Sequence, residues 1–575
     1  MTHLATDILV VGAGGAGMYA AVSAAREGAS VVLADKSLVG RGGATIMAQM
    51  TVAVAVGEQE PDDWTHHLAD TLAAGRGLCN EELAQILCRE APDRIREMDT
   101  WKVGWAREDD HMRQVMAPGH GIRRCVYVDF LNTGPAVAKT LRTRVARSDA
   151  ITRISELAVV DLVVRQGRVL GAVAINLADG APVTIAAKAV ILAAGGLTKL
   201  YRRNSASANM GGDSYALALR AGAELVDMEF VQFFPIGHLA PRLVGMDPIM
   251  WDPFRYKLGG RLLNGEMEEF IENYGASDSG VYTAPRDIAS FAILSEVAAG
   301  RGSPAGGAYL SFTHIPEPEL RQAFGPVIDR LLANGIDLTR RPIEVSPIAH
   351  YHMGGIRVNG EMESRIEGLF AAGEAVGGAN GANRLSGNAI SETFVFGERA
   401  GHFAATKVAA RATGLDFEWD HALAKPALDG IAALEARDEA KGPGAGPLFT
   451  ELQSMMWDHV GLLRDAAGLE QALARLVRMR TVDLPALGTP GSHRFAITVQ
   501  DWFDLRASLL AAEAITASAL ARTESRGAHQ REDHPETDPS LEKNQTVQLE
   551  DGEIATDWVD VVRAPFELAS LEAAE

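Results

Sequence analysis

The feature of this 575-residue chain that most limits its fold is a glycine motif near the N-terminus, set between two strand patterns. Residues 7–11 (DILVV) predict a buried strand, and residues 12–17 follow it as G-x-G-x-x-G. Residues 18–27 favour a helix, and residues 30–34 (SVVLA) predict a second strand that ends at Asp35. The glycines allow a tight turn and close approach of the backbone to a pyrophosphate, and an acid about 20 residues further on suits the adenosine ribose. Together these features predict a dinucleotide-binding α/β domain.

NAD and FAD share this fingerprint, so the motif alone leaves both open. Residues 157–192 contain several β-rich runs separated by turn signals, and they lead into AVILAAGG at residues 189–196. A strand that closes on small residues far from the first motif is common in flavoproteins whose sheet is completed by a returning segment. Residues 368–374 (GLFAAGE) predict another strand, and the Gly- and Asn-rich loop at residues 377–388 suits a polar cofactor tail.

Composition excludes several classes of protein. With 54 Lys and Arg against 75 Asp and Glu the net charge is −21, which argues against a nucleic-acid partner. Cys79, Cys88 and Cys125 lack C-x-x-C spacing and are too few for the four thiolates of an iron–sulfur cluster, so we expect no metal site. No apolar run reaches the roughly 18 residues that cross a membrane, and the N-terminus leaves no room for a signal peptide. We expect a cytoplasmic chain without direct membrane insertion.

Four further stretches carry a resemblance to a known family. They are APRDIASFAI at residues 284–293, HYHMGG at 350–355, AAGEAVGGANGANRLSGN at 371–388 and ESRGAHQRED at 524–533. Over nearly its whole length the chain resembles the flavoprotein subunit of succinate dehydrogenase and fumarate reductase, with L-aspartate oxidase as a close cousin.

The resemblance implies an α/β fold in which a Rossmann-like FAD-binding domain carries an inserted α+β capping domain and is followed by a helical domain and a C-terminal segment. The boundaries that we expect are residues 1–235 and 346–410 for the two parts of the FAD-binding domain, 236–345 for the capping domain, 411–522 for the helical domain and 523–575 for the C-terminal segment.

The resemblance also implies which residues hold FAD. The adenosine half would lie against the first glycines and Asp35, the ribityl chain against Glu374, and the flavin near Ser386 and Asn388. Asp213 matches the family's acidic residue beside the flavin ring, and capping of the helix that follows it is a compatible second role. The full set of expected cofactor contacts is Gly12, Gly14, Gly15, Gly17, Asp35, Lys36, Gly42, Gly43, Ala44, Gly195, Asp213, Glu374, Arg384, Ser386 and Asn388.

Interconversion of a saturated and an α,β-unsaturated carboxylate needs a carboxylate clamp and a group that moves a proton. The planar fork of arginine suits the clamp because it matches a carboxylate with two hydrogen bonds. The resemblance makes Arg286 the proton-transferring residue and assigns Arg384 and His350 to one substrate carboxylate. Arginine is an unusual acid because its pKa is high, so the role of Arg286 rests on the resemblance alone. His352 occupies a variable family position and receives no role.

Two departures from the family pattern bear on cofactor and substrate. Gly43 stands where the membrane-bound respiratory members carry the histidine that bonds FAD covalently, so we expect non-covalent FAD and poor succinate oxidation. Phe234 replaces the histidine of Q-F-H-P-T-G that binds the second carboxylate of succinate. A phenyl ring offers no hydrogen bond, and the charge-assisted contact that is lost is worth roughly 1.5–3 kcal/mol.

Two further departures lie between residues 251 and 260. The stretch YKLGG at residues 256–260 aligns with the family's R-G-E-G-G, which places Leu258 at the relay glutamate. An alignment shifted by one residue stays open. Trp251, Phe254 and Tyr256 lie close in sequence to the family's distal carboxylate contact, with an aromatic core patch in the capping domain as the alternative. We place Phe234, Tyr256, His350 and Arg384 in the substrate pocket.

These features predict an FAD-dependent oxidoreductase whose small substrate keeps one carboxylate and carries a less polar distal group. Electrons would pass through a separate iron–sulfur subunit. Arg526, His529 and Arg531 match a family segment near the partner side, and internal salt bridges are the alternative. Three other functions stay open: an L-aspartate oxidase-like enzyme that uses O₂ or fumarate, an ordinary soluble fumarate reductase, and a catalytically inactive flavin-binding or assembly protein.

Overall fold

The computed structural model describes residues 2–49, 51–129, 132–205, 207–241, 249–251, 258–275, 286–411, 419–435, 444–489 and 496–564. The side chains of residues 286, 287, 326, 411 and 435 lie outside this description.

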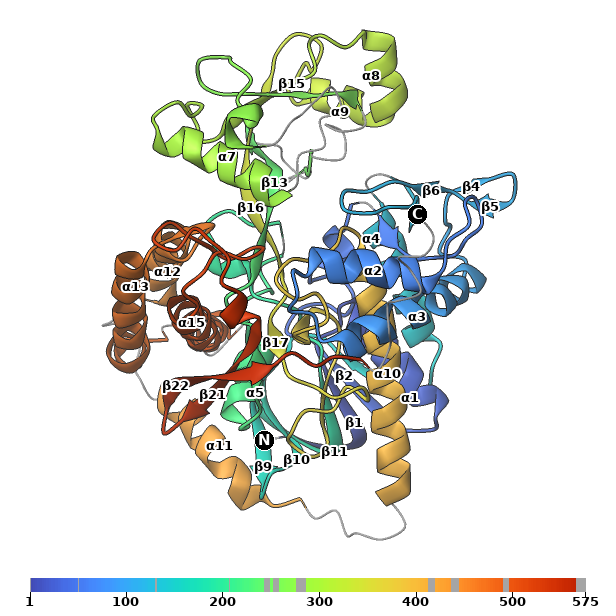
Figure 1. The fold of residues 1–575 in the computed structure, drawn as a ribbon. Helices are drawn as coiled ribbons and strands as arrows, with labels where there is room; N and C mark the ends of the chain where they lie inside the picture. The colour runs from blue at the N-terminus through green and yellow to red at the C-terminus, as the bar shows by residue number, and fades with distance from the viewer. Residues whose placement is uncertain are drawn as a thin grey trace.

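A seven-stranded sheet forms the centre of the molecule (Figure 1). Its order is β8-β2-β1-β11-β10-β9, and β18 also pairs with β11. The pairs that join β1, β2, β8, β11 and β18 are parallel, whereas β9 and β10 complete the sheet with antiparallel pairs. The strands span Thr2–Val11 (β1), Val31–Ala34 (β2), Ile151–Ile154 (β8), Leu157–Arg165 (β9), Arg168–Asn176 (β10), Pro182–Leu192 (β11) and Leu369–Ala371 (β18). The carboxyl ends of β1, β2, β11 and β18 therefore share one edge, where α/β folds bind their ligands.

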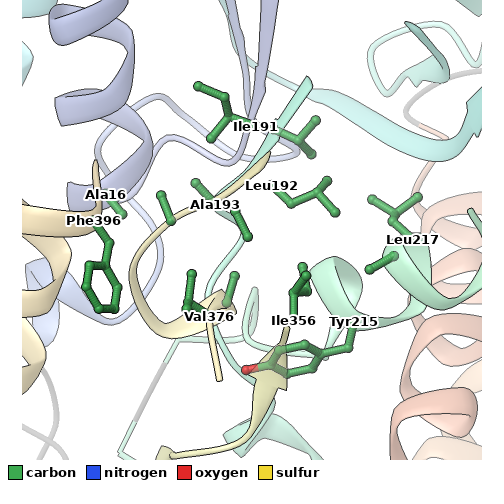
Figure 2. Packing of buried hydrophobic residues seen from close by; sticks show 14 of the residues in the cluster. Ala16, Ile191, Leu192, Ala193, Tyr215, Leu217, Ile356, Val376 and Phe396 are labelled. Atoms are coloured by element: carbon green, nitrogen blue, oxygen red, sulfur yellow. The ribbon is translucent and has the colours of Figure 1, made fainter. Parts of the chain in front are cut away.

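Two helices pack against each other beside this sheet. They are α1 (Gly15–Arg26), which is rich in alanine and glycine, and α10 (Asn388–Arg411). Small residues let the helices approach closely, and a Cβ on Gly401 would lie 2.2 Å from the backbone oxygen of Ala20. Figure 2 shows the end of β11 packed among apolar side chains from α1, α5 (Asp213–Arg220) and α10.

The capping domain rises from the sheet domain on two long strands (Figure 1). These strands, β13 (Val231–Ala240) and β16 (Ile343–His352), are antiparallel, and β15 (Ala308–Ser311) and β14 (Arg261–Leu263) extend the same sheet. Among the described residues, three helices pack with this sheet around a separate apolar core. The helices span Arg286–Ala298 (α7), Glu317–Phe324 (α8) and Pro326–Ala333 (α9).

The structure describes one residue of the predicted aromatic patch. Trp251 is completely buried in the core of the capping domain, with its ring 6.2 Å from that of Phe312 and 6.0 Å from that of Phe324. Trp251 is thus a core residue. Leu258 also packs against this core, whereas Phe254 and Tyr256 lie outside the described residues.

A helical region and a C-terminal hairpin complete the fold. The long helix α15 packs against α12, α13 and α5, and the hairpin of β21 and β22 joins the small sheet β17-β12-β21-β22. No helix in the described ranges is both long and apolar enough to cross a membrane. The bounds are His421–Glu435 (α11), Ala445–His459 (α12), Ala466–Arg478 (α13), Leu484–Ala486 (α14), Ile497–Ala521 (α15), Leu225–Val226 (β12), Gly355–Ile356 (β17), Lys543–Glu550 (β21) and Glu553–Asp560 (β22).

The late charged motif lies inside the protein. Arg526 pairs with Glu524 at 2.8 Å, and Arg531 pairs with Asp533 at 2.8 Å. The ring of His529 contacts the buried guanidinium of Arg464 at 2.8 Å. The structure therefore favours internal contacts for these residues over the partner-side interpretation: ion pairs for Arg526 and Arg531, and hydrogen bonds for His529.

Candidate functional site

One cavity of about 420 Å³ brings together residues from the glycine motif, the Gly/Asn loop and the two strands that lead to the capping domain. It contains most of the predicted cofactor contacts and three of the four predicted substrate residues. Those that line it are Gly12, Gly14, Gly15, Asp35, Lys36, Gly43, Ala44, Gly195, Asp213, Phe234, His350, Glu374, Arg384 and Ser386.

Two glycines of this turn, Gly12 and Gly17, have no room for a side chain, whereas a Cβ on Gly14 would meet no atom within 4 Å. Gly12 has φ +97°, and a Cβ there would lie 2.5 Å from the backbone oxygen of Ala193. A Cβ on Gly17 would lie 1.8 Å from the backbone oxygen of Gly12, so Gly17 serves the packing of helix α1 against the turn. Helix α1 begins at Gly15, whose N–H donates to Oγ1 of Thr45 at 3.2 Å, and the positive end of the helix suits a pyrophosphate. The turn thus fits the phosphates of a dinucleotide.

Asp35 ends β2 and braces the same turn. Its Oδ2 accepts from the backbone N–H of Ala13 at 2.6 Å, and its Oδ1 accepts from the N–H of Ser37 at 2.7 Å. A carboxylate has about four acceptor sites, so Asp35 is able to accept a further hydrogen bond from a ribose hydroxyl.

Lys36 joins the cavity to the helical region. Its Nζ lies 2.9 Å from Oδ2 of Asp213 and 2.9 Å from Oδ1 of Asp504 on α15. Burial alone would lower the pKa of Lys36, but the two carboxylates raise it above its usual value. Burial raises the pKa of Asp213, an effect that Lys36 opposes. Asp213 is the first residue of α5, whose cap is Gly212, and its carboxylate is held by Lys36.

Gly17, Gly42 and Asn388 are not among the described residues that line the cavity. The side chain of Asn388, a residue expected to lie near the flavin, points into the scaffold behind the loop. Its Oδ1 lies 2.8 Å from Nε2 of His67, and its Nδ2 donates to Oγ1 of Thr71 at 3.1 Å.

Two histidines that the sequence analysis missed support this loop. His67 on α2 (Trp64–Ala74) is completely buried, and burial, followed by the charge of Arg124, lowers its pKa to about 3. The neutral ring donates from Nε2 to Asn388 and leaves Nδ1 buried without a hydrogen-bond partner among the described residues. His120 Nε2 lies 2.7 Å from the backbone oxygen of Ser386.

Arg384 is fixed on the cavity wall by its neighbours. Its Nη2 donates to Oε1 of Gln232 at 3.0 Å, and its guanidinium lies 4.4 Å from the centre of the Tyr351 ring. Gln232 in turn donates from Nε2 to the backbone oxygen of Arg384 at 2.9 Å. A guanidinium held in this orientation suits a carboxylate. The sequence analysis did not identify Gln232, because its partner Arg384 lies 152 residues away in the chain.

His350 and Phe234 lie side by side on the paired strands β16 and β13. Nδ1 of His350 is 2.7 Å from Oγ of Ser205, another residue that the sequence analysis did not identify. Phe234 is buried and packs with Met250 and Ile348 in an apolar cluster. The phenyl ring and Met250 both line the cavity beside His350, so this part of the wall is apolar.

Two buried carboxyl groups lie near these residues. Burial raises the pKa of Glu374 to about 8 and that of Glu392 to about 7. The hydroxyl of Tyr351 and the amide of Asn380 both donate to Oε2 of Glu392. Oε1 of Glu374 accepts from the backbone N–H of His352 at 3.1 Å.

Two predicted residues are not placed in the cavity. Arg286 begins helix α7, but its side chain lies outside the described part of the chain, as does the whole of Tyr256. Within the described ranges, no group of three or more His, Cys, Asp or Glu could hold a metal ion.

Comparison with known proteins identifies the family. The chain matches the model of an FAD binding domain over residues 7–390 and the model called fumarate reductase flavoprotein C-term over residues 449–569. It belongs to the succinate dehydrogenase/fumarate reductase flavoprotein family. The predicted family and fold class are confirmed, and the protein is an FAD-dependent oxidoreductase.

Two related proteins and one solved structure are similar to the chain over most of its length. A fumarate reductase (CoM/CoB) subunit of Methanothermobacter marburgensis is 34% identical over 94% of this chain and 96% of its own. L-aspartate oxidase 2 of Ralstonia nicotianae is 33% identical over 82% of this chain and 81% of its own. The structure of a variant of E. coli quinol fumarate reductase FrdA superimposes with a TM-score of 0.90, at 30% identity and with 98% of each chain covered.

Proposed function

We propose that this flavoprotein interconverts a saturated and an α,β-unsaturated acid that has one carboxylate and a less polar group in place of the second. The observation that carries this proposal is the apolar wall of Phe234 and Met250 beside His350, which Ile348 packs against. A second carboxylate against this wall would lose the hydrogen bonds that it makes in water, whereas an alkyl or aryl group would gain from burial.

The carboxylate of this substrate would lie between Arg384 and His350. Arg384 offers a planar fork that Gln232 and Tyr351 hold in place, so little orientational entropy is lost on binding. His350 adds a ring N–H when Ser205 occupies its Nδ1. Bound FAD supplies the hydride acceptor or donor. Arg286, at the start of α7, is the residue that we assign to proton transfer.

FAD is proposed to bind without a covalent link. Gly43 lines the cavity at the position that we align with the family's flavin-linked histidine, has φ +80° and donates its backbone N–H to Oγ of Ser207 at 2.9 Å. Because glycine carries no nucleophile, FAD should be released when the protein is denatured in acid. A flavin that stays with the precipitated chain would contradict this proposal.

Electrons are proposed to pass to a separate iron–sulfur subunit. The relative from Methanothermobacter marburgensis is itself named as one subunit of an enzyme, which supports an assembly of this kind. Purification of the tagged chain from its native host should bring down a protein with iron–sulfur absorbance. If the purified chain alone reoxidises rapidly in O₂ and no such protein follows it, the L-aspartate oxidase-like alternative is favoured.

The substrate proposal is tested by steady-state kinetics with reduced viologen. Fumarate, crotonate and trans-cinnamate share the unsaturated carboxylate and differ in the distal group. We expect kcat/KM for at least one of the two monocarboxylates to exceed that for fumarate by about tenfold or more, because a charge-assisted hydrogen bond is missing for the second carboxylate. Fumarate turning over as well as either monocarboxylate would reject the proposal.

A further inference from the structure

The segment that precedes Ser205 is bound to the strand that carries His350. The backbone N–H of Ala349 donates to the oxygen of Arg203 at 2.9 Å, and the N–H of Ser205 donates to the oxygen of Ala349 at 3.0 Å. Asn204 and Ala349 form a parallel bridge between the two segments. Any displacement of residues 203–205 is therefore transmitted to this end of β16.

The side chain of Arg203 extends from this segment to the capping domain. Its Nη1 donates to the backbone oxygen of Gly306 at 2.9 Å, and its Nη2 donates to that of Ala305 at 3.1 Å. Nη1 also donates to Oγ of Ser346 on β16. Gly306 and Ala305 lie in the turn before β15 of the capping domain, so one guanidinium joins this turn to the FAD-binding domain.

Ser205, two residues further along, contacts His350 directly. Its Oγ lies 2.7 Å from Nδ1 of the ring. When the hydroxyl donates to Nδ1, the neutral imidazole carries its hydrogen on Nε2, which is then able to donate to a carboxylate. Ser205 thus fixes both the orientation and the hydrogen position of His350.

We propose that Arg203 and Ser205 are positioning residues that make the orientation of His350 depend on the docking of the capping domain. Arg203 holds the turn at Ala305 and Gly306, and the same short segment places Ser205 against His350. When this turn moves away, Arg203 loses its acceptors at Ala305 and Gly306 and keeps Oγ of Ser346, so the segment and the ring of His350 are held less firmly. The capping domain would then affect substrate binding without contacting the substrate at this point.

A neighbouring arginine provides a matched control. Arg202 pairs with Asp458 at 3.3 Å and lies over the ring of Trp457, both on helix α12, so it makes its contacts away from the capping domain. A second tie to the capping domain, from the N–H of Met250 to Oε1 of Gln49 at 3.2 Å, does not involve residues 203–205. Removing Arg203 should loosen the turn at residues 305–306 without releasing the whole capping domain.

The test uses the FAD-loaded full-length protein and two measurements that need no substrate. Hydrogen exchange with mass spectrometry follows the amides of residues 303–311, and diethyl pyrocarbonate modification follows the reactivity of His350. We expect Arg203→Ala to raise the exchange rate of these amides and the modification rate of His350 by about threefold or more, because local opening becomes easier when the hydrogen bonds of Arg203 are removed. Arg202→Ala should change neither rate.

Ser205 variants separate coupling from general loosening. Ser205→Ala should speed modification of His350 with little effect on exchange at residues 303–311, and Ser205→Thr, which keeps the hydroxyl, should restore the slow rate. If Arg203→Ala does not fold, Ser346→Ala removes one acceptor of the same guanidinium and should give a smaller change of the same sign. Faster exchange at residues 303–311 with unchanged reactivity of His350 would overturn the coupling.

This inference relies on the proposed function only for the role of His350 in binding a carboxylate. A protein that turns over none of the test acids would reject the proposed function and leave the exchange and modification results valid. Equal exchange rates in the Arg202 and Arg203 variants would reject the inference, whatever acid proves to be the substrate.

Discussion

The phenyl ring of Phe234 lies 5.3 Å from the imidazole of His350, centre to centre, with the two planes inclined by 60°. A ring that can only offer apolar surface therefore adjoins a residue proposed to hold a carboxylate. Because β13 and β16 are paired through Phe234 and Ile348, this arrangement is fixed by the strands that lead to the capping domain.

Exchange of this ring for imidazole should change the substrate preference. In the variant Phe234→His we expect kcat/KM for fumarate to rise by about tenfold or more relative to trans-cinnamate, because a charge-assisted hydrogen bond is worth roughly 1.5–3 kcal/mol. The matched control is Phe234→Leu, which keeps an apolar side chain and should leave fumarate a poor substrate. An unchanged ratio in Phe234→His would show that the second carboxylate does not approach this wall.

Gln232 should matter to substrate binding through Arg384. The variant Gln232→Met keeps side-chain volume but removes the acceptor at 3.0 Å from Nη2 of Arg384. We expect KM for a monocarboxylate to rise by about five- to twentyfold, with a smaller fall in kcat. The loss of one hydrogen bond to a charged group costs roughly 1.5–3 kcal/mol, and a water molecule that binds the guanidinium instead offsets part of this cost.

A double-mutant comparison isolates this effect. If Gln232 acts only by orienting Arg384, Gln232→Met should have little further effect on KM in an Arg384→Ala background. Additive effects of the two changes would show that Gln232 contacts the substrate itself.

The sequence predicted the parts of the site whose signal is local. The glycines from Gly12 to Gly17 predict a phosphate-binding turn because they lie between a strand and a helix. In the structure a Cβ on Gly12 would lie 2.5 Å from the backbone oxygen of Ala193. The capping insertion was implied only by the family resemblance, which rests on the order of several short motifs. These signals depend on neighbouring residues, which a sequence displays directly.

The residues that support the site gave no such signal. Asn388 was predicted to lie near the flavin, and nothing in the sequence indicated that His67, 321 residues away, holds its side chain behind the loop. The family resemblance implied Lys36 as a cofactor contact, whereas its contact with Asp504 spans 468 residues and depends on the docking of α15. Such pairs are set by tertiary packing, which neither periodicity nor spacing records.

His67 should affect FAD binding through the loop that ends in Asn388. The variant His67→Leu leaves Oδ1 of Asn388 buried without its donor, and an unsatisfied buried polar group costs about 1–3 kcal/mol. We expect the FAD dissociation constant, measured by flavin fluorescence, to rise by about three- to tenfold. His67→Gln keeps a donor and should recover part of the affinity, whereas His66→Leu alters an adjacent ring that is 42% exposed and makes no hydrogen bond with Asn388 in the described part of the chain, and it should have little effect. Equal affinity in the two leucine variants would exclude this role.

Glu392 should make the stability of the protein depend on pH. Burial raises the pKa of this carboxyl from 4.5 to about 7, and its Oε1 has no hydrogen-bond partner among the described residues. The folded state therefore binds the proton more tightly than the unfolded state. Its stabilising contribution is fully present below pH 4.5 and is lost as the pH rises through about 7.

The variant Glu392→Gln removes this titration and keeps an acceptor for Tyr351 and Asn380. Between about pH 5 and pH 8 we expect the free energy of unfolding, measured with urea, to fall by about 1–3 kcal/mol less in the variant than in the parent protein. Glu398→Gln, on the same helix but partly exposed, serves as the control for a change of charge on α10. If Glu392→Gln and the parent lose stability in parallel over this range, the carboxyl is already ionised in the folded state at pH 5, and the buried proton at Glu392 is excluded.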